Sequence, residues 1–325
     1  MPVHRRRILQ LGVGVVLAPF LPFIARSESY PSRPVRLLVG YAAGGVNDIC
    51  ARLTAQWLSE RLGQQFVVED RPGAGSNLAT DAVVRAKADG YTLLEASTSN
   101  AWNATLYQNL NFDFIRDVAP VASTVLTYNV LVTNLSFPAK TVPELIAYAK
   151  ANPGKINMGS AGPGSSPHLY GELFKSMAGV DMTTVHYRGD GPAVPDLLGG
   201  QIDVMFGSVV TWSEQIKGGK VRALAVTSAT RTKLFPELAP IGEFVPGYEG
   251  FGWQGIGAPK NTPQDIIDKL NREINAGLAD PKLKAQFENL GAEIFSDSPA
   301  QFGKFIADYT QKWAKVIRAA GVKAE

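Results

Sequence analysis

The clearest pattern in the chain is an alternation of short apolar runs with segments of helical spacing. Residues 35–39, VRLLV, have the character of a buried strand, and apolar residues then recur three or four positions apart from Val46 to Trp57. A helix is therefore predicted to begin near residue 45. The same alternation predicts three further elements: a strand at 65–69, a helix at 77–88 and a strand at 91–97. Such an order is typical of an α/β fold with right-handed crossovers.

The pattern changes in the middle of the chain and then starts again. Residues 118–135 are rich in valine, threonine and leucine without a helical period, which predicts two extended segments that carry the chain across a hinge. Thr141 and Glu144 match a capping box for a helix that ends near Asn152, and a strand at 156–160 follows it. We therefore expect a second lobe of the same α/β type.

The size of the chain also favours two lobes. Removal of residues 1–27 leaves 298 of the 325 residues, which is more than one hydrophobic core usually holds. Lobe 1 is predicted to comprise 28–127 together with 251–325, and lobe 2 is predicted to comprise 128–250. A long amphipathic helix at 299–320 is expected to pack on lobe 1.

The amino terminus has the features of an export signal. Three arginines, Arg5 to Arg7, precede an apolar stretch at 8–24, and small residues around Ser27 suit a signal peptidase. We expect cleavage near Ser27 and a periplasmic mature protein. The general secretory and twin-arginine routes both remain open. A retained anchor is the alternative, although Pro19 and Pro22 interrupt a run of only about 17 residues.

Charge and cysteine content exclude several functions. Loss of the signal removes four arginines, which leaves 28 basic against 29 acidic residues and turns the formal charge of +3 into −1. The mature chain has no basic runs, so nucleic acid is not an expected partner. Cys50 is the only cysteine, which rules out an internal disulfide and favours a small buried side chain.

The loop after the first strand is suited to binding an anion. Gly44 and Gly45 allow close approach to the backbone, and the first amides of the following helix have no partner within it. These amides carry partial positive charge, so a carboxylate or phosphate would be stabilised there. The alternative is an ordinary strand-to-helix turn of small residues. Asp48 would stabilise the helix dipole in either case, and we expect its role to be structural.

Two more turns have similar chemistry. Residues 160–166, SAGPGSS, join a strand to a helix and offer backbone amides and serine hydroxyls to a carboxylate, or else an ordinary helix cap. Arg188 follows a strand and either faces an anion or pairs with Asp190, while Tyr187 is a candidate wall of a pocket. Trp102, Trp212 and Trp253 would line a cavity for an aromatic ligand or else belong to the core.

The sequence offers little sign of catalysis. His168 and His186 have no acids or cysteines at metal-ligand spacing, so neither a metal nor a cofactor is expected. The nucleophile-elbow spacing Gly-X-Ser-X-Gly is absent. A serine hydrolase with Ser165 or Ser160 as nucleophile is therefore the less favoured alternative.

The chain resembles the Bug family of periplasmic receptors, the binding components of tripartite tricarboxylate transporters, in segments that follow the family's order. Four of them are YPSRPVRLLV, GQQFVVEDRPGAGSNLAT, PAKTVPELIAYAKANPGKINMGSAGPGSSPHL and VHYRGDGPAVPDLLGGQIDVMF. The resemblance implies a two-lobed venus-flytrap fold, type II-like, with extended crossings between the lobes. It also implies a monomer that binds a small carboxylate without reaction and passes it to membrane subunits. A sensor that feeds a two-component kinase is the alternative output.

The resemblance also assigns candidate ligand-binding residues. Three turns match the family. Polar residues at the carboxyl ends of strands are added as candidates, because open sheets bind ligands at those ends. The candidates are Tyr41, Ala42, Ala43, Gly44, Gly45, Asp48, Ser97, Thr98, Ser160, Gly164, Ser165, Ser166, Tyr187, Arg188, Gly189 and Ser208. The family usually has proline where this chain has Gly40 and Ala43. Many relatives carry an acid where this chain has Ser208. Its replacement by serine favours a ligand whose distal group is more anionic or neutral. A dicarboxylate, an aromatic acid or an amino acid fits these residues.

Overall fold

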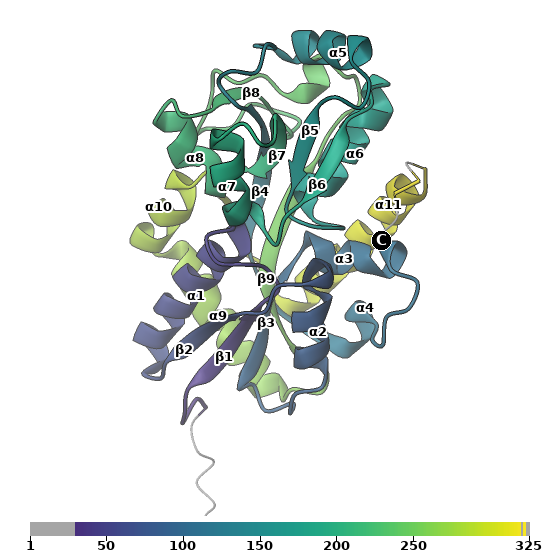
Figure 1. Ribbon diagram of the computed structural model, residues 1–325. Coiled ribbons are helices and arrows are strands. Elements are labelled where there is room, and N and C mark those ends of the chain that lie inside the picture. Colours follow the sequence, from purple (N-terminus) through teal and green to yellow (C-terminus); the bar gives the residue numbers. More distant parts are fainter. Residues whose placement is uncertain (1–29, 320, 323–325) are drawn as a thin grey trace, which may run out of the picture.

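The protein consists of two α/β lobes joined by long strands (Figure 1). The computed structural model describes residues 30–319 and 321–322, so the predicted export signal lies outside the described residues. Lobe 1 contains β1 (Val35–Val39), α1 (Val46–Leu62), β2 (Phe66–Asp70), α2 (Asn77–Val84), β3 (Thr92–Ser97), α3 (Thr98–Leu106), α4 (Phe114–Asp117), β9 (Phe251–Pro259), α9 (Gln264–Ala279), α10 (Pro281–Asn289), β10 (Glu293–Ile294) and α11 (Pro299–Ala319).

Lobe 2 repeats the strand-and-helix order of lobe 1. It contains α5 (Val142–Ala151), β5 (Asn157–Ser160), α6 (Ser166–Ala178), β6 (Thr183–His186), α7 (Asp190–Leu198), β7 (Val204–Ser208), α8 (Val209–Lys217) and β8 (Arg222–Val226). A single long strand, β4 (Val118–Thr133), belongs to both lobes. The order of strands is β2-β1-β3-β9-β4-β7-β5-β6, with β10 and β8 also paired to β4.

Strand β4 connects the two sheets by changing its partners. It pairs antiparallel with β9 from Val118 to Tyr128 and with β7 from Asn129 to Thr133. The expectation that residues 118–135 are extended and cross between the lobes is confirmed for Val118–Thr133, but they form one strand instead of two, because the chain bends without breaking. Two shifts of register against β9, after Pro120 and after Ser123, supply that bend.

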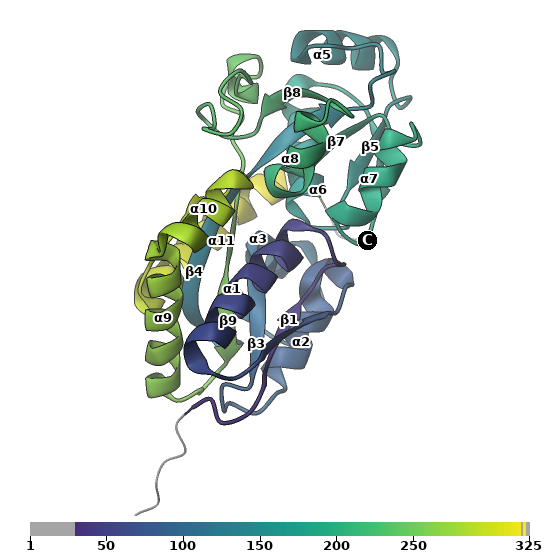
Figure 2. The ribbon, with the colours of Figure 1, turned by 90° about the vertical axis from the view of Figure 1, so that its left-hand side faces the viewer.

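Helices cover both faces of the lobe 1 sheet. Helices α1, α9 and α10 share an apolar cluster with one face, and α2, α3 and α11 share a cluster with the other (Figure 2). The prediction that the last helix packs on lobe 1 is confirmed. Trp313 of α11 is buried and its ring centroid lies 4.9 Å from that of Trp102 in α3.

The three tryptophans with two possible roles belong to the core. The rings of Trp102, Trp212 and Trp253 are fully buried, and Cys50 is also buried as its apolar neighbours predict. Since these rings fill the interior, none of the three tryptophans indicates an aromatic ligand.

Two local predictions need correction. Helix α2 ends at Val84, short of residue 88, because the amide of Ala86 bonds to the carbonyl of Val83 and so closes a tighter turn. Thr141 does cap α5, accepting a hydrogen bond from the amide of Glu144 at 3.3 Å. The Glu144 carboxylate, however, accepts from the amide of Lys140 rather than that of Thr141, so the capping box is shifted by one residue.

Candidate functional site

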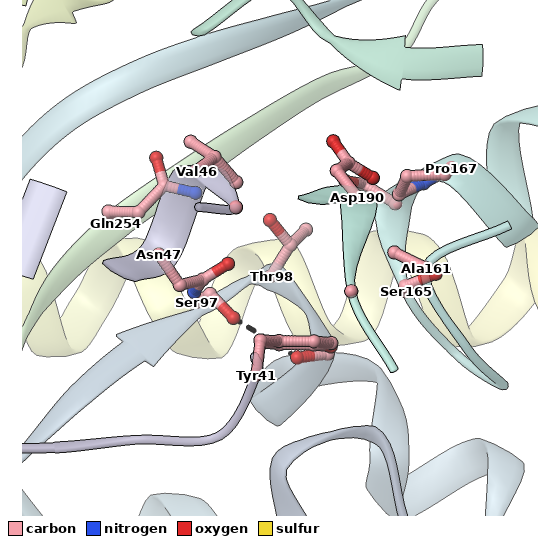
Figure 3. Close-up of a pocket in the computed structure, with 14 residues that line it drawn as sticks. Tyr41, Val46, Asn47, Ser97, Thr98, Ala161, Ser165, Pro167, Asp190 and Gln254 are labelled. Carbon is pink, nitrogen blue, oxygen red and sulfur yellow. Dashed lines mark hydrogen bonds between the residues drawn. The ribbon is translucent and has the colours of Figure 1, made fainter. Parts of the chain in front are cut away.

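A pocket lies where the two lobes meet, and both lobes contribute its walls (Figure 3). Lobe 1 provides one wall and lobe 2 provides the facing wall. The lining residues are Tyr41, Gly45, Val46, Asn47, Ser97, Thr98, Ser99, Ala161, Ser165, Ser166, Pro167, Gly189, Asp190 and Gln254. No lysine or arginine side chain is among them, so any anion bound here would be held by neutral groups.

Four helices begin at this pocket. The residues that precede their first turns, Gly45 of α1, Ser97 of α3, Ser165 of α6 and Gly189 of α7, all line it. Two of these helices come from each lobe. Neither α1 nor α7 has a side chain that caps its first amides. Convergent helix amino termini with free amides favour a negatively charged group between them.

The first loop is held in shape by Asp48. One carboxylate oxygen of Asp48 accepts a hydrogen bond from the amide of Gly44 at 2.9 Å, and the other lies 2.6 Å from Nε of Arg52. Gly44 itself has φ +83°, a conformation that favours glycine. Asp48 does not line the pocket, and its geometry agrees with the structural role expected for it.

The loop between β5 and α6 is stabilised by its own polar side chains. The Ser165 hydroxyl donates to the carbonyl of Gly162 at 2.7 Å and accepts from the amide of His168 at 3.4 Å. It therefore caps α6 and at the same time lines the pocket. Ser160 lies deeper, where its hydroxyl is 2.8 Å from Nδ1 of His186.

The two histidines near this loop have structural contacts. The amide of Gly164 donates to Nδ1 of His168 at 3.0 Å. Burial and the neighbouring His186 lower the pKa of His168 to about 4. Neither histidine lines the pocket, and Ser160 is fully buried away from it. A serine–histidine pair is thus present, but it has no access to a bound solute.

The turn after β6 directs its side chains away from the pocket. The Tyr187 hydroxyl donates to the carboxylate of Asp196 at 2.7 Å. The side chain of Arg188 is exposed and makes no ion pair with Asp190, although pairing was one of the two expectations. The backbone carbonyl of Arg188 instead accepts a hydrogen bond from the amide of Ala42 across the lobes at 3.0 Å.

Glycines allow the two lobes to approach closely at the same place. A Cβ atom on Gly191 would lie 2.7 Å from the carbonyl oxygen of Ala43, and one on Gly75 would lie 2.7 Å from that of Pro163. Each pair joins a residue of lobe 1 to a residue of lobe 2. The backbones of the two walls therefore approach so closely that only glycine fits at positions 75 and 191.

Seven of the candidate residues from sequence line the pocket and nine do not. Those that line it are Tyr41, Gly45, Ser97, Thr98, Ser165, Ser166 and Gly189. Those that lie outside its lining are Ala42, Ala43, Gly44, Asp48, Ser160, Gly164, Tyr187, Arg188 and Ser208. The second group shapes the turns, as the contacts above show for most of its members.

Four polar residues of the lining were not among the candidates: Asn47, Ser99, Asp190 and Gln254. Three of them have unpartnered side-chain atoms. Asn47, Asp190 and Gln254 are each at least nine-tenths buried, and each has a side-chain atom without a hydrogen-bond partner: Nδ2, Oδ1 and Oε1, respectively. Asn47 and Asp190 stand directly beside candidate positions. Gln254 is a single polar residue inside the apolar strand β9, and that was the signal that sequence reasoning could have used.

Asp190 has an unusual environment for a carboxyl group. Its Oδ2 atom accepts a hydrogen bond from the amide of Ser208 at 2.8 Å. Burial raises the pKa of Asp190 to about 6, and the bond from Ser208 opposes this shift. The carboxyl group therefore keeps its proton to a higher pH than an exposed aspartate does.

The described residues give no indication of a metal or of a membrane span. Within residues 30–319 and 321–322, no three His, Cys, Asp or Glu side chains come together as metal ligands would. No helix in that part of the chain combines the length and apolarity needed to cross a bilayer.

Comparison with known proteins identifies the family. Residues 50–322 match the family described as "Tripartite tricarboxylate transporter family receptor". The chain belongs to this family of receptors. It is 37% identical over 321 residues to Protein BugT of Bordetella pertussis, covering 98% of each chain. The resemblance to the Bug proteins is thereby confirmed.

Solved structures of relatives confirm the two-lobed periplasmic binding protein fold. One is Rpa4515 of R. palustris with adipate, with a TM-score of 0.88, 34% identity and coverage of 90% of this chain and 99% of that one. Another is MatC from Rhodopseudomonas palustris with bound malate, with a TM-score of 0.85, 29% identity and coverage of 89% and 100%. Both are similar to this chain over nearly their whole length, and both were solved with a small dicarboxylate.

Proposed function

We propose that this protein is a periplasmic receptor that captures a small carboxylate between its lobes and delivers it to the membrane subunits of a tripartite transporter. The observation that carries the proposal is the convergence of four helix amino termini on one pocket that has no basic side chain. Backbone amides stabilise a carboxylate without a full counter-charge, so the ligand is held reversibly.

Lobe closure is the proposed mechanism of capture. Lobe 1 contributes Gly45 and Ser97, and lobe 2 contributes Ser165 and Gly189. A carboxylate touches both sets only when the lobes are together, so its binding favours the closed arrangement. The hydrogen bond from Ala42 to Arg188 would form in the same step.

Relatives support the ligand class and the partner. The proteins solved with adipate and malate share this fold, and the family is described as a transporter receptor. The predicted signal at residues 1–27 would deliver the chain to the periplasm. We propose that the mature protein acts there as a monomer, with lobe 1 at 28–127 and 251–325 and lobe 2 at 128–250.

The contacts of the serines argue for binding without catalysis. The hydroxyl of Ser165, which lines the pocket, donates its proton to the carbonyl of Gly162 and accepts from the backbone amide of His168, not from its ring. Ser160 has a histidine partner but is fully buried. Neither arrangement supplies an activated nucleophile at the pocket.

A thermal-shift screen tests the proposal. Mature protein, residues 28–325, would be mixed with mono-, di- and tricarboxylates, aromatic acids and amino acids. At about 100 times the dissociation constant, a ligand of the folded state adds roughly 2.7 kcal/mol, which raises the melting midpoint by a few degrees. We expect a shift with one family of carboxylates.

The amide of each active carboxylate is the matched control, and it should give no shift because it lacks the negative charge. Uptake of the same compound should be lost in cells without this protein and restored by its expression. Absence of a shift with every acid in the screen would contradict the receptor function, and unchanged uptake would contradict its link to transport.

A further inference from the structure

The pocket contains hydrogen-bonding groups that a simple carboxylate leaves without partners. Asn47 Nδ2 is an unpartnered donor, whereas Asp190 Oδ1 and Gln254 Oε1 are unpartnered acceptors. A carboxylate has only acceptor oxygens, so it suits Asn47 and the helix amides. It offers nothing to Asp190 Oδ1, which is an acceptor only, and buried polar groups without partners cost free energy.

Asp190 also lacks any compensating charge. Its Oδ2 atom is used by the amide of Ser208, and no basic side chain lines the pocket. The neighbouring Arg188 is exposed and is not paired with it. A second carboxylate of the ligand placed beside Asp190 would meet a like charge, which is unfavourable in a buried site.

On the basis of the proposed function, we propose that Asp190 makes this receptor selective for carboxylates that carry an ammonium group, that is, for amino acids. The ligand carboxylate lies at the helix amino termini and Asn47, and its ammonium group donates to Asp190 Oδ1 and Gln254 Oε1. This arrangement gives partners to the three unpartnered atoms of Asn47, Asp190 and Gln254 and neutralises the buried carboxyl group.

The geometry at Ser208 agrees with this assignment. From the sequence alone, serine at position 208 in place of an acid favours a ligand whose distal group is anionic or neutral. In the structure, however, Asp190 places a carboxylate oxygen 2.8 Å from the Ser208 amide. A negative group is therefore present in this part of the pocket, supplied by α7 instead of by the end of β7. The raised pKa of Asp190 is consistent with an acid that awaits a cationic partner.

The test compares pairs of ligands that differ only in the amino group. Isothermal titration at pH 7.5 would use succinate and aspartate, glutarate and glutamate, adipate and 2-aminoadipate, and 3-phenylpropionate and phenylalanine. In the wild-type protein, the amino acid of whichever pair binds should bind at least about tenfold more tightly than its partner without nitrogen. Equal or tighter binding of the compound without nitrogen would overturn the proposal.

A variant assigns the selectivity to Asp190. Asp190→Asn keeps an oxygen for the Ser208 amide and removes the charge, so the preference for the amino acid should fall at least about tenfold while the diacid binds as well or better. Asp196→Asn is the matched control, because it makes the same change on the same helix at a residue outside the pocket.

The possible results separate this inference from the function itself. Equal weakening of both members of a pair by Asp190→Asn would mean that the residue only positions the β7–α8 turn, and the proposal would be wrong. If only compounds without nitrogen bind, the receptor function stands and the selectivity fails. If no carboxylate binds, the receptor function fails as well.

Discussion

At the scale of single residues, Asp190 is a buried carboxyl group in a pocket without a basic side chain. It is 3% exposed, it has one partnered and one unpartnered oxygen, and no basic side chain shares its pocket. Burial raises its pKa from the ordinary aspartate value of 3.8 to about 6. Because the folded state holds the proton more tightly than the unfolded chain, protonation of this group stabilises the fold.

A pH dependence of stability follows from this shift. The contribution of Asp190 is most favourable below about pH 4 and is lost as the pH rises to about 6. Asp190→Asn cannot titrate, so its free energy of unfolding minus that of the wild type should rise by up to roughly 3 kcal/mol over this window. Urea denaturation of the ligand-free proteins between pH 4 and pH 8 measures this difference. A constant difference would show that burial does not perturb the carboxyl group.

At the scale of elements, the last helix, α11, packs against a pocket helix from each lobe. Trp313 of α11 contacts Trp102 of α3 in lobe 1 and Tyr170 of α6 in lobe 2, with ring centroids 4.9 and 5.7 Å away. Helices α3 and α6 both begin at the pocket. The aromatic cluster therefore connects two of the four pocket helices, one from each lobe, in the arrangement seen here.

Removal of the ring should be costly. Trp313 is 3% exposed, and Trp313→Ala should lower the free energy of unfolding by about 3–5 kcal/mol because the surroundings cannot fill the cavity. Chemical denaturation followed by circular dichroism provides the measurement. Gln311→Ala, on the exposed face of the same helix, should change stability by less than about 0.5 kcal/mol. Similar losses for both variants would contradict this account of α11.

At the scale of the whole molecule, the site depends on close approach of the lobes. The contact between Gly191 and Ala43 involves backbone on the lobe 1 side, which cannot rotate away as a side chain can. Any side chain at Gly191 would therefore act as a wedge between the lobes while each lobe stays intact.

Gly191→Ala should weaken binding of the best ligand by roughly tenfold, since overpacking by one methyl group costs on the order of 1–3 kcal/mol. The melting midpoint without ligand should change little. Leu198→Ala is the control, because this residue ends the same helix, is exposed and lies outside the lining of the pocket. Titration calorimetry measures affinity, and small-angle scattering with ligand should show a more open Gly191→Ala variant. Unchanged affinity would mean that the lobes need not approach this closely.

The elements and the family of this protein could be predicted from local patterns. Strand β1 and helix α1 appear in the sequence as an apolar run followed by helical spacing, since both depend on neighbours within a few positions. The turns with free amides could be found for the same reason, and Gly45, Ser97, Ser165 and Gly189 were all among the candidates.

The composition of the pocket was decided by tertiary packing. Helices α1, α3, α6 and α7 meet because β4 and β9 hold the lobes face to face, and no local pattern encodes that meeting. Gln254 and Asp190 reach the same pocket from segments far apart in the chain, so their roles depend on contacts that only the folded chain makes. Sequence therefore identified the donors of an anion site, while the fold determined which acceptors stand opposite them.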